Sequence, residues 1–144
     1  MDREILFRGK RKPGEEWVYG DLIREKDAFG EICTRIFQIK GNGLFRKNEV
    51  DPETVCQYTG LTDKNGRKIF EGDICEFSVF DYNDHDTQYK GIVVYSGSRF
   101  MLWKSKESEY YGYDGGFDLD WVVSQDDEFK ITGNIFDNPE LLNQ

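Results

Sequence analysis

Apolar and polar residues alternate over several stretches of the chain, which is the pattern of β-strands that bury one face. In residues 31–39, Ile32 and Ile36 would face one way, while Cys33 and Phe37 would face the other. Successive side chains of a strand point to opposite faces, so this period of two predicts a strand. The same reasoning predicts strands at 4–8, 17–23, 58–61, 67–70, 74–80, 90–95, 99–103, 117–123 and 129–135.

Residues typical of tight turns separate the predicted strands. Asn65-Gly66 stands between two of them, and this pair is preferred where both turn residues have positive φ. A Ser-Gly-Ser sequence centred on Gly97 predicts a second hairpin. Helical structure is expected only as short turns at residues 51–54 and 138–142, where Asp or Asn stands directly before a proline.

The predicted elements indicate a mostly β protein. We expect a small N-terminal β lobe over residues 1–57 and an acidic β-barrel-like lobe over residues 58–144, with one continuous domain as the alternative. Five strands joined by short turns between residues 67 and 136 suit an SH3-like barrel. A sandwich would give a similar string of strands.

The charge is unevenly distributed along the 144 residues. The chain carries 19 Lys and Arg against 28 Asp and Glu, a net charge of −9. Residues 1–57 hold 11 of each kind, whereas residues 58–144 hold 8 basic and 17 acidic residues. An acidic surface repels phosphate groups, so the C-terminal part is a poor candidate for non-specific nucleic-acid binding.

The cysteines and the apolar runs indicate an intracellular protein. Cys33, Cys56 and Cys75 are odd in number and widely spaced, which favours buried reduced thiols over a disulfide framework or a zinc site. No apolar run reaches the roughly 18 residues of a membrane-spanning helix. The N-terminus also lacks the apolar core of a signal peptide, so we expect a cytoplasmic location.

Four blocks of sequence occur in one order and cover nearly the whole chain. They lie at residues 3–9, 17–22, 50–74 and 131–142. Together they resemble the YopX family of phage and prophage proteins, although Cys56 stands where we would expect glycine. The resemblance implies a phage or prophage origin and a place in the cytoplasm of the bacterial host. It implies no assigned reaction, so it supplies no catalytic or binding residue.

We find no motif that predicts catalysis. His85, the only histidine, lies in the acidic loop 81–86, which lacks the glycine and glutamate that a calcium loop of the EF-hand type needs at its sixth and twelfth positions. We expect this loop to be solvated, and ion binding there stays open. The carboxylate pairs Glu71/Asp73 and Asp118/Asp120 are expected to be structural. The sequence therefore predicts no enzyme, no metal site and no cofactor.

Two features remain as candidate binding sites. They are the basic turn Lys10, Arg11 and Lys12, and the tyrosine loop Tyr110, Tyr111 and Tyr113. Cations can contact phosphates, but two glutamates follow the basic turn at once. Tyrosine and glycine together are typical of adaptable recognition loops.

These observations favour a non-enzymatic protein-interaction module whose partner is a host protein, a phage protein or a second copy of the chain. One alternative is an acidic decoy that occupies the nucleic-acid-binding surface of a host factor. Another is a nucleic-acid-binding module that uses the N-terminal basic turn. The three differ in how steeply binding should fall with salt.

Overall fold

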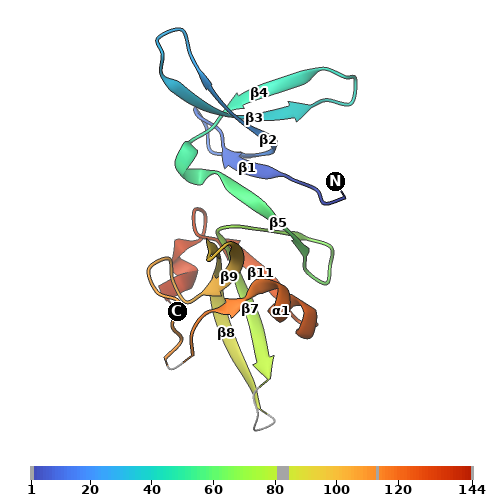
Figure 1. Ribbon diagram of the computed structural model, residues 1–144, viewed down its shortest axis with the longest axis vertical. Helices are drawn as coiled ribbons and strands as arrows, with labels where there is room; N and C mark the ends of the chain where they lie inside the picture. The colour runs from blue at the N-terminus through green and yellow to red at the C-terminus, as the bar shows by residue number, and fades with distance from the viewer. Residues whose placement is uncertain (1, 81–84, 113, 144) are drawn as a thin grey trace. The chain divides into compact units, whose positions relative to one another are not determined.

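Strands form most of the structure, a computed structural model that describes residues 2–80, 85–112 and 114–143 (Figure 1). The chain divides into two compact units, Met1–Tyr58 and Thr59–Gln144. All strand pairs with a described register are antiparallel, which confirms the prediction of a mostly β protein. Within the described residues, no helix combines the length and apolar character that a membrane crossing requires.

The first unit is a ring of short strands. Its elements are β1 (Phe7–Lys10), β2 (Trp17–Lys26), β3 (Ile32–Ile39), β4 (Phe45–Glu49), the 3-10 helix η1 (Pro52–Thr54) and the start of β5 (Cys56–Thr62). Hydrogen bonds join them in the order β4-β3-β2-β1-β5. The ring closes where the residues after β4 return to β1, because Lys12 N donates to Glu49 O and Asp51 N donates to Lys10 O, both at 2.9 Å.

The first unit has a small core and one very close approach between strands. Its buried apolar residues are Val18, Ile36, Val50, Cys56 and Tyr58, of which the first three form one packed cluster. β2 pairs with β1 as far as Gly20 and with β3 from Asp21 onward. A Cβ on Gly20 would stand 2.2 Å from the carbonyl oxygen of Phe37, so this crossing point admits only glycine.

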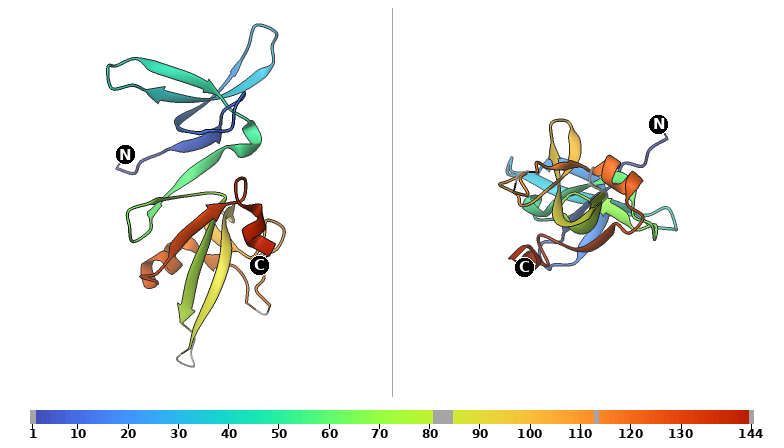
Figure 2. Two further views of the ribbon diagram at one scale, coloured as in Figure 1. Left: turned by 180° about the vertical axis from the view of Figure 1, so that it is seen from behind. Right: turned by 90° about the horizontal axis from the view of Figure 1, so that it is seen from below.

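The second unit packs a helix against a five-stranded sheet. Its elements are β6 (Lys68–Phe70), β7 (Asp73–Phe80), β8 (Asp86–Ser96), β9 (Arg99–Trp103), β10 (Phe117–Asp118), α1 (Leu119–Gln125), β11 (Lys130–Asn134) and η2 (Pro139–Asn143). The sheet has the order β10-β9-β8-β7-β11, and Figure 2 shows it from two further sides. Its core joins β7 and β8 to α1 through Phe77, Val93, Leu119 and Val122.

The helix α1, about two turns long, corrects the expectation that residues 117–123 form a strand. The strand ends at Asp118, whose side chain caps the helix by accepting a hydrogen bond from Asp120 N at 3.2 Å. Leu119 and Val122, three residues apart, are both fully buried on the sheet. Short apolar runs fit either period, and burial against the sheet decides for the helix here.

One turn differs from the sequence-based expectation, and the hairpin predicted at Gly97 is confirmed. At the Asn65-Gly66 turn only the glycine has positive φ, at 80°. The two-residue turn between β8 and β9 has positive φ at both Gly97 (62°) and Ser98 (68°). The turn that needs two left-handed residues is thus the second hairpin, where its twist matches that of the strands. The SH3-like arrangement of the second lobe stays a prediction.

Candidate functional site

The basic turn does not present three free cations together. Arg11 Nη1 donates to Glu16 Oε2 at 3.1 Å, an ion pair within the same turn. Lys10 Nζ lies 5.4 Å from the centroid of the Trp17 ring, which also carries the guanidinium of Arg8 at 4.6 Å. Of the three candidate residues only Lys12 is in the exposed class, and Lys10 and Arg11 already interact with Trp17 and Glu16, so little of the predicted charge is left for a phosphate.

The tyrosine loop separates into parts with different surroundings. Tyr113 lies outside the described residues. Tyr110 is 58% exposed, whereas Tyr111 packs into an aromatic cluster. The centroid of the Tyr111 ring lies 5.1 Å from that of Tyr89 and 5.6 Å from that of Phe117. Tyr111 is therefore a packing residue that anchors the loop, and Tyr110 is the described tyrosine that a partner could reach.

The hydroxyl group of Tyr111 is buried and has no hydrogen-bond partner among the described residues. It lies against the backbone of β8, because a Cβ on Gly91 would stand 2.3 Å from it. Burial raises the pKa of this phenol, and Cys75 and Tyr89 add to the effect. Tyr111 therefore stays protonated at neutral pH and is unsuited to act as a base.

The other candidates for chemistry are structural or exposed. Asp73 is buried, and its carboxylate accepts a hydrogen bond from Phe70 N at 2.8 Å. Burial raises the pKa of Cys75 strongly, with the Asp73 charge as a second cause, so this thiol is not a nucleophile. His85 is exposed, and the preceding residues 81–84 of its loop lie outside the described residues. Residues 2–80, 85–112 and 114–143 contain no group of three or more potential metal ligands.

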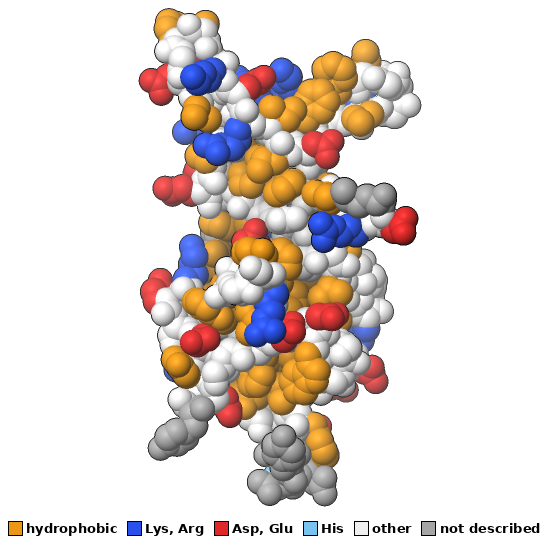
Figure 3. All heavy atoms as spheres, viewed as in Figure 1, with side chains coloured by type: hydrophobic (Ala, Val, Ile, Leu, Met, Phe, Trp, Pro, Cys, Tyr) orange, Lys and Arg blue, Asp and Glu red, His pale blue; other side chains and the backbone are white. Residues whose placement is uncertain are grey.

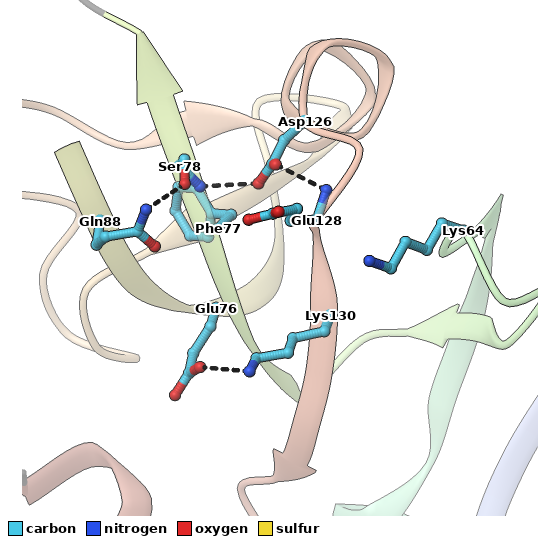
Figure 4. A pocket seen from close by; sticks show the side chains of 8 residues that line it. All are labelled: Lys64, Glu76, Phe77, Ser78, Gln88, Asp126, Glu128 and Lys130. Atoms are coloured by element: carbon cyan, nitrogen blue, oxygen red, sulfur yellow. Dashed lines mark hydrogen bonds and ion pairs between the residues drawn. The ribbon is translucent and has the colours of Figure 1, made fainter. Parts of the chain in front are cut away.

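A polar cavity of about 230 Å³ lies beside β7 and β11 in the second unit (Figure 4). Its walls carry the side chains of Lys64, Glu76, Phe77, Ser78, Gln88, Asp126, Glu128 and Lys130. Asp126 accepts hydrogen bonds from Ser78 N at 2.8 Å and from Glu128 N at 2.9 Å. Lys130 Nζ lies 3.4 Å from Glu76 Oε2.

The groups that line this cavity mostly bind one another. The pairing of β11 with β7 ends at Glu76, and the carboxylate of Asp126 accepts the hydrogen bond of Ser78 N just beyond that point. Asp126 thus satisfies a backbone N–H group that the strand would otherwise leave unpaired at its edge. Ligand pockets are usually larger and mainly apolar, whereas Phe77 is the one aromatic side chain in this wall. We therefore interpret the cavity as a solvated groove whose lining side chains stabilise the edge of the sheet.

An exposed apolar surface, which the sequence reasoning missed, lies at the end of the β3–β4 hairpin. Three large apolar side chains stand there in water: Ile39 is 73% exposed, Leu44 65% and Phe45 63%. Figure 3 shows hydrophobic side chains gathered over this hairpin. We call these three residues, with Lys40 and Arg46, the β3–β4 tip. Its signal in the sequence was Leu44-Phe45 directly after a Gly-Asn-Gly turn, where polar residues are the rule.

Hydrogen bonds hold the β3–β4 tip in a defined shape. Lys40 N donates to Leu44 O, Gly43 N donates to Lys40 O at 3.0 Å, and Leu44 N donates to the side chain of Asn42 at 3.1 Å. Gly43 has a φ of 83°, which a residue with a side chain rarely adopts. Phe45 leans on Phe37, with ring centroids 4.6 Å apart. The exposed apolar side chains therefore lie on a turn whose conformation is fixed by hydrogen bonds.

A charge triad braces the three strands behind the tip. Glu25 Oε1 on β2 accepts from Arg35 Nη1 on β3 at 2.7 Å and from Lys47 Nζ on β4 at 3.2 Å. The hydrogen bond from Lys47 is the main cause that lowers the pKa of Glu25, with Arg35 adding to it and desolvation opposing. One carboxylate on β2 thus binds both its neighbour β3 and the next strand, β4.

The family comparison covers almost the whole chain. The model of the family described as YopX protein matches residues 6–143. The chain belongs to the YopX family. This confirms the resemblance drawn from the four sequence blocks. A search of curated protein sequences gave no significant match.

Two crystal structures share the fold of this YopX family member. Protein EF1440 from Enterococcus faecalis superposes with a TM-score of 0.54 at 25% identity, covering 98% of this chain and 99% of that one. Protein yopX from Bacillus subtilis gives a TM-score of 0.52 at 16% identity, with 95% of each chain covered. Neither name states an activity, so the residues of this YopX protein must carry the functional argument.

Proposed function

We propose that this YopX protein is a non-enzymatic protein-interaction module of phage or prophage origin that acts in the cytoplasm of a bacterial host. The β3–β4 tip is the observation that carries the proposal. Ile39, Leu44 and Phe45 are each more than half exposed, on a unit that buries five apolar residues: Val18, Ile36, Val50, Cys56 and Tyr58.

Burial of the β3–β4 tip by a partner would contribute favourably to the free energy of binding. Burial of a large apolar side chain contributes roughly 1.5–3 kcal/mol. Contiguous exposed apolar patches on folded proteins commonly mark binding surfaces. The hydrogen-bonded turn of the tip limits the entropy that a partner would have to remove, which favours recognition.

The state of the ionisable groups supports a binding role over catalysis. Cys75 and Tyr111 both have raised pKa values because they are buried, so neither is poised as a nucleophile or a base. The carboxylates Asp73 and Asp126 serve as acceptors for backbone N–H groups. The ion pair of Arg11 with Glu16 weakens the case for nucleic-acid binding through the basic turn.

Affinity capture of the tagged full-length chain from bacterial lysate, with nuclease present, tests the proposal. We expect the wild type to retain a protein partner and the variant Phe45→Ser to lose it. Tyr95→Ser is the matched control, because Tyr95 is 59% exposed on the other unit. Equal capture by both variants would refute the role of the tip. A steep loss of binding with salt would favour the acidic-decoy alternative.

A further inference from the structure

The charges beside the β3–β4 tip restrict what can cover it. Residues 39–46 contain Lys40 and Arg46 and no acidic residue, while the next residue, Lys47, already pairs with Glu25. Two tips placed face to face would bring like charges together, which disfavours a symmetric contact between tips. The surface that fits the tip must therefore combine carboxylates with an apolar or aromatic centre.

The second unit of the chain offers such a surface on α1. Residues 118–128 hold five Asp or Glu residues and no Lys or Arg. The exposed side of the helix presents Asp120 beside Trp121, which is 48% exposed. We call these two residues the α1 face. Leu119 and Val122, both fully buried, fix the helix on the sheet, so the tryptophan stands on a rigid support.

We infer that the β3–β4 tip of one copy docks on the α1 face of a second copy, head to tail. This inference rests on the proposed function and names its partner. Leu44 and Phe45 supply the apolar side of the contact and Trp121 the aromatic side. In this contact the cations Lys40 and Arg46 would face the carboxylate of Asp120. Tryptophan is the residue type most often found at the energetic centre of protein interfaces.

Cations and tryptophan already pair within this chain. The guanidinium carbon of Arg8 lies 4.6 Å from the centroid of Trp17, and Lys10 lies over the same ring. Arg46 beside Trp121 of another copy would repeat that contact, which adds to affinity when water is excluded.

Paired charge reversals test the inference on the full-length chain by sedimentation velocity. The wild type should associate as its concentration rises, and the association should weaken at least about tenfold between low and high salt, because charges beyond about a Debye length are then screened. The variants Lys40→Glu/Arg46→Glu and Asp120→Lys should each remain monomeric. An equimolar mixture of the two should associate again, because each tip then meets an α1 face of opposite charge.

Two further variants guard against misfolding and unspecific charge effects. Trp121→Ser should weaken association at every salt concentration, since it removes an exposed ring without changing the charge. Lys106→Glu, an exposed change outside both surfaces, should leave association unchanged. A wild type that stays monomeric throughout, or a mixture that fails to associate, would overturn the inference. Loss of lysate capture in Phe45→Ser would then still support the proposed function, with another protein as partner.

Discussion

Tyr111 places a polar atom where the rest of its environment is aromatic. Its ring contacts Tyr89, Phe117 and Phe77, and its hydroxyl lies over Gly91 with no hydrogen-bond partner among the described residues. A buried hydroxyl that makes no hydrogen bond loses the interaction it had with water. The aromatic ring of Tyr111 therefore stabilises the fold of this loop, whereas its desolvated hydroxyl group destabilises it.

Replacing Tyr111 by phenylalanine should raise the free energy of unfolding by about 1 kcal/mol, because the ring contacts stay and the desolvated hydroxyl is removed. Gly91→Ala should cost about 1–3 kcal/mol in the wild type, since the new methyl would meet the hydroxyl. The cost should be smaller in the Tyr111→Phe background. Urea unfolding of the four proteins measures the cycle, and strictly additive changes would contradict this account of the contact.

Glu25 should titrate below its ordinary value of 4.5, because Lys47 and Arg35 donate to its ionised form. A carboxyl whose folded pKa is lowered stabilises the fold above its unfolded pKa. That contribution is lost as the pH falls through the lower, folded value. NMR titration of the side chain should show the low midpoint in the wild type and a midpoint nearer 4.5 in Lys47→Ala. Lys40→Ala is the control and should leave it unchanged.

At the scale of elements, local signals predicted those parts whose structure is decided locally. Asp51 does cap η1, with its side chain accepting from Glu53 N at 3.0 Å, and Pro52 begins the helix. The alternation in β3 did predict the strand, although burial does not follow it: Ile36 is fully buried, whereas Ile32 on the same predicted face is 59% exposed. β4, with the sequence FRKNE, has no alternation of apolar and polar residues. It is a strand because its backbone pairs with β3. Contacts distant in sequence decided β4 and α1, so neither could be inferred from its own residues.

The candidate site was even less predictable than the elements. The sequence reasoning selected Tyr110, Tyr111 and Tyr113 by composition, yet Tyr111 turned out to pack inside the second unit. It passed over Leu44 and Phe45, since exposure depends on which residues the remaining strands cover. Apolar residues next to a glycine turn were a local signal, but only the three-dimensional arrangement shows that nothing described covers them.

Gly20→Ala should destabilise the first unit by about 1–3 kcal/mol, because the methyl group would overlap the carbonyl of Phe37 where β2 passes from β1 to β3. Thermal unfolding followed by circular dichroism measures the effect. Gly41→Ala is the matched control, since nothing lies within 4 Å of the added Cβ and its φ is not positive. An equal response of the two variants would refute the close approach at Gly20.

At the scale of the whole molecule, the two units differ in the amount of buried apolar material. The packed cluster of the first contains three buried residues, Val18, Ile36 and Val50, whereas the cluster of the second contains nine. Local opening requires less free energy where fewer apolar contacts are lost.

Backbone amides in β2 and β3 should therefore exchange with solvent deuterium at least about tenfold faster than those in β7 and β8, a difference of about 1.4 kcal/mol in opening free energy. Hydrogen exchange followed by mass spectrometry resolves the two sets of strands. Matched protection in both units would show that they open together as one cooperative body.

The strand β5 has a practical consequence for anyone who wishes to separate the two units. The division between them falls at Tyr58 and Thr59, inside a strand that runs from Cys56 to Thr62. Cys56 and Gln57 pair with β1, and Thr59 Oγ1 donates to Ile69 O at 2.8 Å. Residues 56–62 therefore offer a protease no loop to cut, and a gene split at this point would divide the strand β5 between the two fragments.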